Sequence, residues 1–120
     1  MIDCRTPEEY AGQMVQEVDL PVARDRMPGR IPGARNLSTR DLVDPATGRL
    51  RPREELQALY AERGVTDDVE VAVYCRVAER SSLLWFVLDE LLGHPRVRNY
   101  DGGWAEYGSL IDAPVERDLG

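Results

Sequence analysis

Residues 71–86 constrain the fold of this 120-residue chain more than any other stretch. Val71-Ala72-Val73-Tyr74 is an apolar, partly β-branched run that ends at Cys75 and a polar loop. Apolar residues on both faces of such a run are typical of a buried parallel strand. The pattern therefore predicts a central strand at residues 70–74 with a thiol at its carboxyl end, which is the edge of an open α/β sheet where ligands bind.

The segment after the loop needs one decision between strand and helix. Leu83 to Leu88 is an unbroken apolar run that could form a strand or a helix. The pattern continues to a helix stop at Gly93, and this length favours a helix. At 100° per residue, Phe86 projects away from the apolar stripe, toward solvent or a partner domain. The stripe itself consists of Leu84, Val87, Leu88, Leu91 and Leu92.

Cys75 is the candidate nucleophile. The amino end of the following helix supplies unpaired N–H groups and partial positive charge, so we expect a thiolate whose pKa falls from about 8.5 into the range of about 3.5–7.5. The alternative is an ordinary buried cysteine that serves only packing. Arg76 and Arg80 weigh against that alternative, because charged side chains are seldom fully buried without partners.

The loop Cys75-Arg76-Val77-Ala78-Glu79-Arg80-Ser81 resembles the active-site loop of rhodanese-type sulfurtransferases. Three further blocks, at residues 3–10, 29–36 and 99–104, are similar to other conserved segments of that family and follow in the same order. The resemblance covers nearly the whole chain and is greatest to the carboxy-terminal, catalytic domain of bacterial two-domain thiosulfate sulfurtransferases.

This resemblance implies an α/β, rhodanese-like domain spanning residues 1–120, with a mostly parallel central sheet of about five strands and helices on both faces. It implies transfer of sulfane sulfur from thiosulfate to cyanide or a thiol acceptor through a persulfide on Cys75. The donor would be bound by the loop that follows the cysteine, which comprises Arg76, Val77, Ala78, Glu79 and Arg80.

Two departures from the family pattern affect the site. The family commonly has glycine where this chain has Ala78, and an alanine with positive φ costs on the order of 1 kcal/mol. The family usually has histidine where this chain has Arg30, which puts any role for that position in doubt.

Two other functions remain open from the sequence. Cysteine-dependent phosphatases and arsenate reductases use a related loop with five residues between cysteine and arginine, whereas four separate Cys75 from Arg80 here. A non-catalytic rhodanese module for binding or regulation is the other alternative, although such modules usually lack the cysteine.

The amino-terminal strand, Met1 to Arg5, begins unusually late, because a buried strand normally runs about 5–6 residues. We therefore expect a domain truncated at its N-terminal edge, and an upstream rhodanese-like domain is a possible partner. Cys4 is expected to be a packing residue, with a role as resolving thiol as the alternative. Thr6 and Pro7 are typical of a helix start, and residues 13–28 are expected to form a solvated loop at the mouth of the site.

The remaining elements follow from local patterns. We expect a strand at residues 34–38, a helix at 52–63, a last strand at 96–100 and a short final helix with Trp104 in the core. His94, the single histidine, falls in a connecting loop, so a catalytic dyad with Cys75 is not expected.

Composition excludes several classes of function. A net charge of −7 without a basic run argues against nucleic-acid binding. No apolar run approaches the roughly 18 residues of a membrane span, and no signal peptide opens the sequence. One histidine and two cysteines far apart in sequence predict neither a metal site nor a cofactor. The expected location is cytoplasmic, with reduced thiols.

Overall fold

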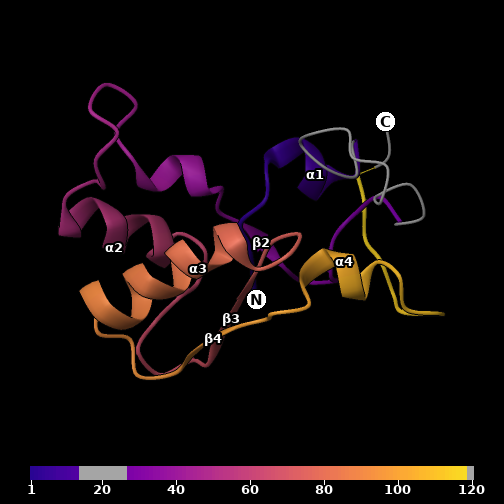
Figure 1. Cartoon of the computed structure of the whole chain (residues 1–120). Coiled ribbons are helices and arrows are strands. Elements are labelled where there is room, and N and C mark those ends of the chain that lie inside the picture. The colour runs from indigo at the N-terminus through magenta and orange to yellow at the C-terminus, as the bar shows by residue number, and fades with distance from the viewer. Residues whose placement is uncertain (14–26, 119–120) are drawn as a thin grey trace.

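The computed structural model describes residues 1–13 and 27–118. Its described strands form a single parallel sheet in the order β2-β1-β3-β4, with β3 beside β1 near the centre (Figure 1). The strands are β1 (Ile2–Asp3), β2 (Arg35–Asn36), β3 (Val71–Tyr74) and β4 (Val97–Asn99). The predicted α/β class is confirmed, with four strands in the described ranges.

Each predicted strand is present but shorter than expected. The predicted segment 34–38 is reduced to two paired residues in β2, and the segment 96–100 to three in β4. Strand ends are the part of an element that local sequence specifies least, because pairing depends on the neighbouring strand.

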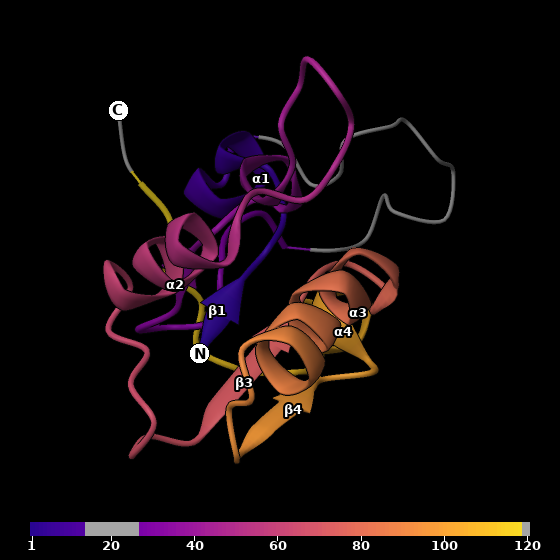
Figure 2. The ribbon, with the colours of Figure 1, turned by 90° about the vertical axis from the view of Figure 1, so that its left-hand side faces the viewer.

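Helices cover both faces of the sheet, as predicted. Figure 1 places α2 and α3 on one side and α1 and α4 on the other, and Figure 2 shows α2 and α3 in front of the strands. The helical elements are α1 (Pro7–Ala11), η2 (Thr39–Leu42), α2 (Arg53–Ala61), α3 (Glu79–Phe86), η3 (Val87–Leu91) and α4 (Gly103–Tyr107).

The core is divided by the sheet into two clusters. On the side of α2 and α3, Ile2 and Val73 pack with Leu56, Leu84 and Leu88, all of them almost fully buried. On the other side, Tyr74 packs with Trp104 of α4 and Ala34. Trp104 is completely buried, so the prediction that it belongs to the core is confirmed.

The helix predicted after the active loop is confirmed, but its last part is wider than an α-helix. In η3 the amide of Leu92 bonds to the carbonyl of Val87, a spacing of five residues. Such a π-type turn rotates the following side chains off the α-helical stripe. Leu91 was predicted on the apolar stripe and is instead exposed, whereas Phe86 points outward as predicted.

The amino-terminal helix start has the predicted capping arrangement. The Thr6 hydroxyl accepts a hydrogen bond from the Glu9 amide, and the Glu9 carboxylate accepts one from the Thr6 amide. Pro7 occupies the first helical position and Gly12 ends α1 with φ of 87°. The loop predicted at the mouth of the site falls largely on residues 14–26, which lie outside the described part of the chain.

Arg30 stabilises the carboxy-terminal segment. Its guanidinium lies over the Tyr10 ring and forms ion pairs with Glu116 and Asp118. Its backbone also pairs with Glu116 in an antiparallel bridge. Arg30 therefore holds the end of the chain against α1. Within the described ranges, no helix is long and apolar enough to cross a membrane.

Candidate active site

Cys75 lies where the sequence predicts, directly after β3 at the carboxyl edge of the sheet. Its side chain is fully buried, and the loop 75–78 carries the chain from β3 into α3. The thiol therefore lies beneath the loop rather than on the surface.

Hydrogen bonds around Cys75 favour its thiolate. The Cys4 thiol bonds to its sulfur, the Ser81 hydroxyl lies 3.5 Å away, and the amides of Ser81 and Val77 also donate to it. The hydrogen bond from Cys4 is the largest influence, and together these donors outweigh burial and lower the pKa of Cys75 to about 4. The thiolate is therefore the dominant form at neutral pH.

Cys4 has the opposite protonation behaviour. Its hydrogen bond to Cys75 and its burial raise the pKa of the Cys4 thiol far above the usual value, so Cys4 keeps its proton and acts as the donor. The sequence favoured a packing role for Cys4, with a role as resolving thiol as the alternative, and the structure places the two cysteines beside each other. Packing alone is therefore an incomplete description of Cys4.

The loop has a positive φ at Ala78, the position where the family commonly has glycine. Ala78 adopts φ of 69°, a left-handed conformation at the start of α3. This conformation is strained for any residue with a Cβ and is the reason that glycine suits the position. The loop keeps the shape nonetheless, since Ala78 is buried and the residues around it fix the path of the chain.

The start of α4 holds the outer side of the loop. The amides of Trp104 and Ala105 donate to the carbonyls of Cys75 and Arg76 at 2.8 and 2.9 Å. A Cβ on Gly103 would lie 2.6 Å from both carbonyl oxygens, so only glycine permits this close approach. With these carbonyls engaged by α4, the loop amides of Val77 and Ser81 can point toward the sulfur.

Arg80 is positioned by a buried carboxylate. Its two terminal nitrogens lie 2.8 and 3.3 Å from the oxygens of Glu9, which is fully buried in α1. Burial alone would raise the pKa of Glu9, but the hydrogen bonds and charge of Arg80 outweigh it and lower that pKa. This pair ties α1 to the start of α3.

Arg76 has a different environment from Arg80. Among the described residues, its Nε is buried and has no hydrogen-bond partner. An unpaired buried donor is uncommon and invites a functional explanation. The other predicted loop residues, Val77 and Glu79, expose their side chains. Val77 therefore faces the site only through its backbone amide.

A buried ion pair supports the loop from the other side of the sheet. Arg5 and Asp3 are both completely buried, with 2.8 Å between Nη2 and Oδ2. The Tyr74 hydroxyl also donates to Asp3 at 2.7 Å, and the Arg5 guanidinium lies 4.8 Å from the centre of the Trp104 ring. These contacts connect β1, β3 and α4 directly beneath Cys75.

A cavity of about 250 Å³ opens at the same edge of the sheet. Arg40 and Arg80 line it, and among the described residues no carboxylate does, although the whole chain has a net charge of −7. Two guanidinium groups therefore border the cavity, and that of Arg80 is also ion-paired with Glu9. Its remaining lining residues are Cys4, Thr6, Ser38, Thr39 and Val43.

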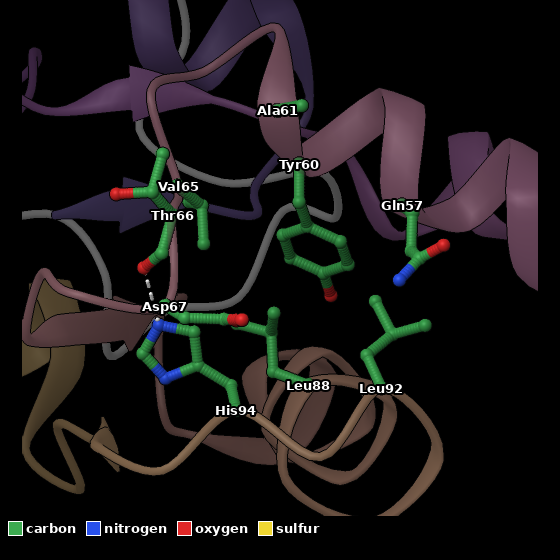
Figure 3. A pocket seen from close by; sticks show the side chains of 9 residues that line it. All are labelled: Gln57, Tyr60, Ala61, Val65, Thr66, Asp67, Leu88, Leu92 and His94. Carbon is green, nitrogen blue, oxygen red and sulfur yellow. Dashed lines mark hydrogen bonds between the residues drawn. The ribbon is translucent and has the colours of Figure 1, made fainter.

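His94 lies at the opposite edge. Its Nε2 donates to the Thr66 carbonyl at 2.9 Å (Figure 3). Its Nδ1 accepts from the Arg96 amide, so both ring nitrogens are engaged. Thr66 precedes β3, whereas Cys75 follows it. His94, which is bonded to Thr66, and Cys75 therefore lie at opposite ends of β3, and they form no dyad, as expected. Tyr60, Leu88 and Leu92 line the pocket beside His94.

Sequence reasoning missed several residues that surround the thiol. The Asn99 side-chain oxygen accepts a hydrogen bond from the Ser81 hydroxyl at 2.7 Å, and Arg40 reaches the cavity from η2, the short helix after β2. Glu9 was read only as part of a helix cap. The alternation of Asp3 and Arg5 on one side of a strand was a usable signal, but nothing local pointed to Arg40 or Asn99.

Comparison with known proteins gives the family. Residues 1–110 match the model of the rhodanese-like domain. The chain is 47% identical over 116 residues to the "Putative thiosulfate sulfurtransferase" of Mycolicibacterium smegmatis and 45% identical over 117 residues to the sulfur carrier protein TtuD of Thermus thermophilus. These matches cover 97% and 98% of the chain but only 42% and 41% of the two relatives.

Solved structures agree with this assignment. The anaerobic ergothioneine biosynthesis enzyme from Chlorobium limicola, in complex with trimethyl histidine, matches 99% of this chain at 27% identity with a TM-score of 0.83. A persulfide form of EanB with ergothioneine matches with a TM-score of 0.82 at the same identity. In each case the match covers 28% of the longer chain. On the sequence match and the fold together, the chain belongs to the rhodanese-like domain family.

Proposed function

We propose that this domain is a thiosulfate sulfurtransferase that moves sulfane sulfur to cyanide or a thiol acceptor through a persulfide on Cys75. The observation that carries this proposal is the Cys75 thiolate, buried beneath a loop whose amides point at it and with a pKa of about 4. A nucleophile that is already ionised needs no general base, which fits the absence of histidine from the described site.

The first half-reaction follows from this arrangement. The Cys75 thiolate attacks the outer sulfur of thiosulfate, the sulfur–sulfur bond breaks, and sulfite leaves with the electron pair. The persulfide that remains is an anion at neutral pH, and the amides of Val77 and Ser81 would stabilise its charge as they stabilise the thiolate. An acceptor then removes the outer sulfur, so the route is ping-pong.

The arginines would bind the dianionic donor. Arg80 and Arg40 line the cavity at this edge, and the buried Nε of Arg76, which has no partner among the described residues, offers a further hydrogen-bond donor. A guanidinium matches an oxyanion with two parallel hydrogen bonds. Among the described residues that line the cavity, an anion entering it meets two guanidinium groups and no carboxylate.

The size of the loop supports sulfur transfer over phosphate chemistry. Four residues separate Cys75 from Arg80, and the amides at Val77 and Ser81 converge on a single sulfur atom. The phosphatase and arsenate-reductase alternative requires a wider ring that holds a tetrahedral oxyanion. The ionised cysteine likewise makes a purely binding module the weaker alternative.

A protein thiol is the second candidate acceptor. The relative TtuD is named a sulfur carrier, which favours delivery to another protein over release to cyanide. Since the chain spans about two-fifths of the relatives, an upstream rhodanese-like domain as a partner is also part of this proposal. A cytoplasmic location completes it, because reducing conditions keep the cysteine nucleophile from being oxidised to a disulfide.

Mass spectrometry of the intact protein tests the proposal. Treatment with thiosulfate should add one sulfur atom to the wild-type chain, and cyanide should remove it with formation of thiocyanate. Cys75→Ser is the matched control and should gain no sulfur. A wild-type chain whose mass stays unchanged in excess thiosulfate would rule out thiosulfate as the donor.

A further inference from the structure

Cys4 and Cys75 occupy adjacent positions on neighbouring parallel strands. Ile2 pairs with Val73 and Asp3 with Tyr74, so the next pair in the same register is Cys4 and Cys75. The ladder continues to this point, because the Cys4 amide donates to the Tyr74 carbonyl at 2.9 Å. Neighbouring strands lie about 4.8 Å apart, and disulfides join residues whose Cα atoms are about 4.4–6.8 Å apart.

Both sulfur atoms lie on the same face of the sheet. Cys4 and Cys75 belong to the core cluster beneath α2 and α3, whereas Tyr74 belongs to the cluster on the other face. The two side chains therefore pack side by side in one cluster, at the next position of the register that pairs Asp3 with Tyr74. Backbone spacing and side-chain direction thus both meet the requirements of a bond between them.

The cavity at this edge reaches Cys4. Cys4 lines it together with Thr6, Thr39 and Arg80, while Cys75 is fully buried and is not part of the lining. A small anion that leaves the thiol pair therefore has an exit beside Cys4, past the positive charge of Arg80.

From this geometry we propose that Cys4 is a resolving thiol: it attacks the inner sulfur of the Cys75 persulfide, closes a Cys4–Cys75 disulfide and releases the outer sulfur as hydrosulfide. The sulfur–sulfur bond of the persulfide breaks as the disulfide forms. The thiol proton of Cys4 goes to the departing sulfur, so atoms and charge balance. The proposal rests on the proposed function in one respect, namely that Cys75 carries a persulfide.

Loading of Cys75 with sulfur changes the group that Cys4 faces, from a thiolate to the inner sulfur of a persulfide. Before loading, the Cys4 thiol donates to a thiolate, and that contact and its burial hold its pKa high, so Cys4 is inert. In the persulfide the negative charge resides on the outer sulfur, and the inner sulfur becomes an electrophile. Its position beside Cys75, on the same face of the sheet, then places Cys4 for attack. A dithiol reductant would reopen the disulfide and restore both thiols.

The activity added by this step is donor reduction. With a dithiol present, the domain would convert the sulfane sulfur of its donor into hydrosulfide without any cyanide or protein acceptor. Without a dithiol, a single turnover would leave the domain locked as a disulfide. The second thiol thus decides whether a persulfide waits for an acceptor or discharges on its own.

A single-turnover experiment tests the proposal. Inorganic polysulfide loads Cys75 independently of thiosulfate, excess reagent is removed under anaerobic conditions, and the protein is incubated with no acceptor. The wild-type mass should pass from one sulfur heavier than the reduced chain to two hydrogens lighter, with one hydrosulfide trapped by a bimane reagent per chain. Cys4→Ser should stay one sulfur heavier and release no hydrosulfide over the same period.

The bond itself is readily located. All 15 basic residues are arginine, so tryptic cleavage after arginine places the two cysteines in separate peptides, residues 1–5 and 64–76. After incubation these peptides should be linked in the wild type and separate after reduction by a dithiol.

The two proposals fail in different ways. Loading by polysulfide but not by thiosulfate would overturn the proposed donor and leave the resolving role intact. A wild-type persulfide that persists as long as that of Cys4→Ser would overturn the resolving role, as would loss of sulfur without the linked peptide or with a disulfide between two chains. Failure of both donors to load Cys75 would overturn both proposals.

Discussion

The two edges of the sheet in this domain each have a pocket and a titratable residue, but the hydrogen bonds around that residue differ. At the carboxyl edge, Cys75 and Arg76 lie among buried polar groups, and within the described residues Arg5 Nη1 and Arg76 Nε have no hydrogen-bond partner. At the amino edge, His94 lies beside a pocket of about 240 Å³, but both of its ring nitrogens bond to backbone. A pocket and a titratable residue are therefore present at both edges.

The difference teaches what distinguishes a reactive edge from a structural one. Side chains at the carboxyl edge come from the ends of several strands, so Cys4 lies beside Cys75 and Asn99 is connected to Cys75 through the Ser81 hydroxyl. Their hydrogen bonds stabilise a charge. At the amino edge the polar side chain of His94 bonds instead to backbone groups of the connecting segments, so it stabilises the path of the chain. The four predictions below test that contrast.

The largest effect should come from removing the nucleophile. Cys75→Ser should abolish sulfur transfer from thiosulfate to cyanide, because a serine hydroxyl stays protonated where the thiol is ionised. His94→Ala, at the other pocket, should retain activity in the same thiocyanate assay wherever the variant is folded. Loss of activity in the folded His94 variant would mean that the amino edge takes part in the reaction.

The next effect concerns the two arginines of the loop. Arg76→Ala and Arg80→Ala should each raise KM for thiosulfate about 10- to 150-fold, since a hydrogen bond to a charged group is worth about 1.5–3 kcal/mol. Arg98→Ala is the control, because Arg98 is also an arginine but is mostly exposed on β4.

Thermal melting separates binding from folding for these variants. Arg80→Ala should also lower Tm, because it leaves the buried Glu9 carboxylate without its ion-pair partner. An unchanged KM in both arginine variants would assign them a structural role and make thiosulfate an improbable donor.

The pH dependence of Cys75 reactivity should show a smaller but more specific effect. With its pKa lowered to about 4, the thiol is ionised above that pH, so the rate of alkylation by iodoacetamide should fall only as pH drops through about 4. Cys4→Ala removes the largest stabilising hydrogen bond and should move this midpoint upward. A midpoint shared by wild type and Cys4→Ala would show that the loop amides alone hold the thiolate.

The smallest effect concerns the strained residue of the loop. Ala78→Gly should raise the free energy of unfolding by on the order of 1 kcal/mol, because glycine adopts φ of 69° without the Cβ clash. Ala58→Gly, in the exposed middle of α2, should lower it by about 1 kcal/mol. Denaturant unfolding of both variants checks the signs, and a loss of stability in Ala78→Gly would mean that the surroundings already accommodate the alanine.

The sequence by itself determined the order of elements and the position of the nucleophile. The strand before Cys75, the helix after it and the cap at Thr6 are encoded by nearest neighbours, so patterns of apolar residues and caps predict them. The question whether Ala78 adopts a positive φ was also local, since it arose from one alanine in a tight loop where glycine is common. These predictions needed no knowledge of how the strands pair.

Tertiary structure alone decided which residues surround the thiol. Cys4 and Cys75 are 71 positions apart, and only the parallel register of β1 and β3 makes them neighbours on one face. The bond from Arg80 to Glu9 likewise needs α1 and α3 to pack at the same edge. Such pairings depend on strand order and helix packing, which are set by burial across the whole chain rather than by any local pattern.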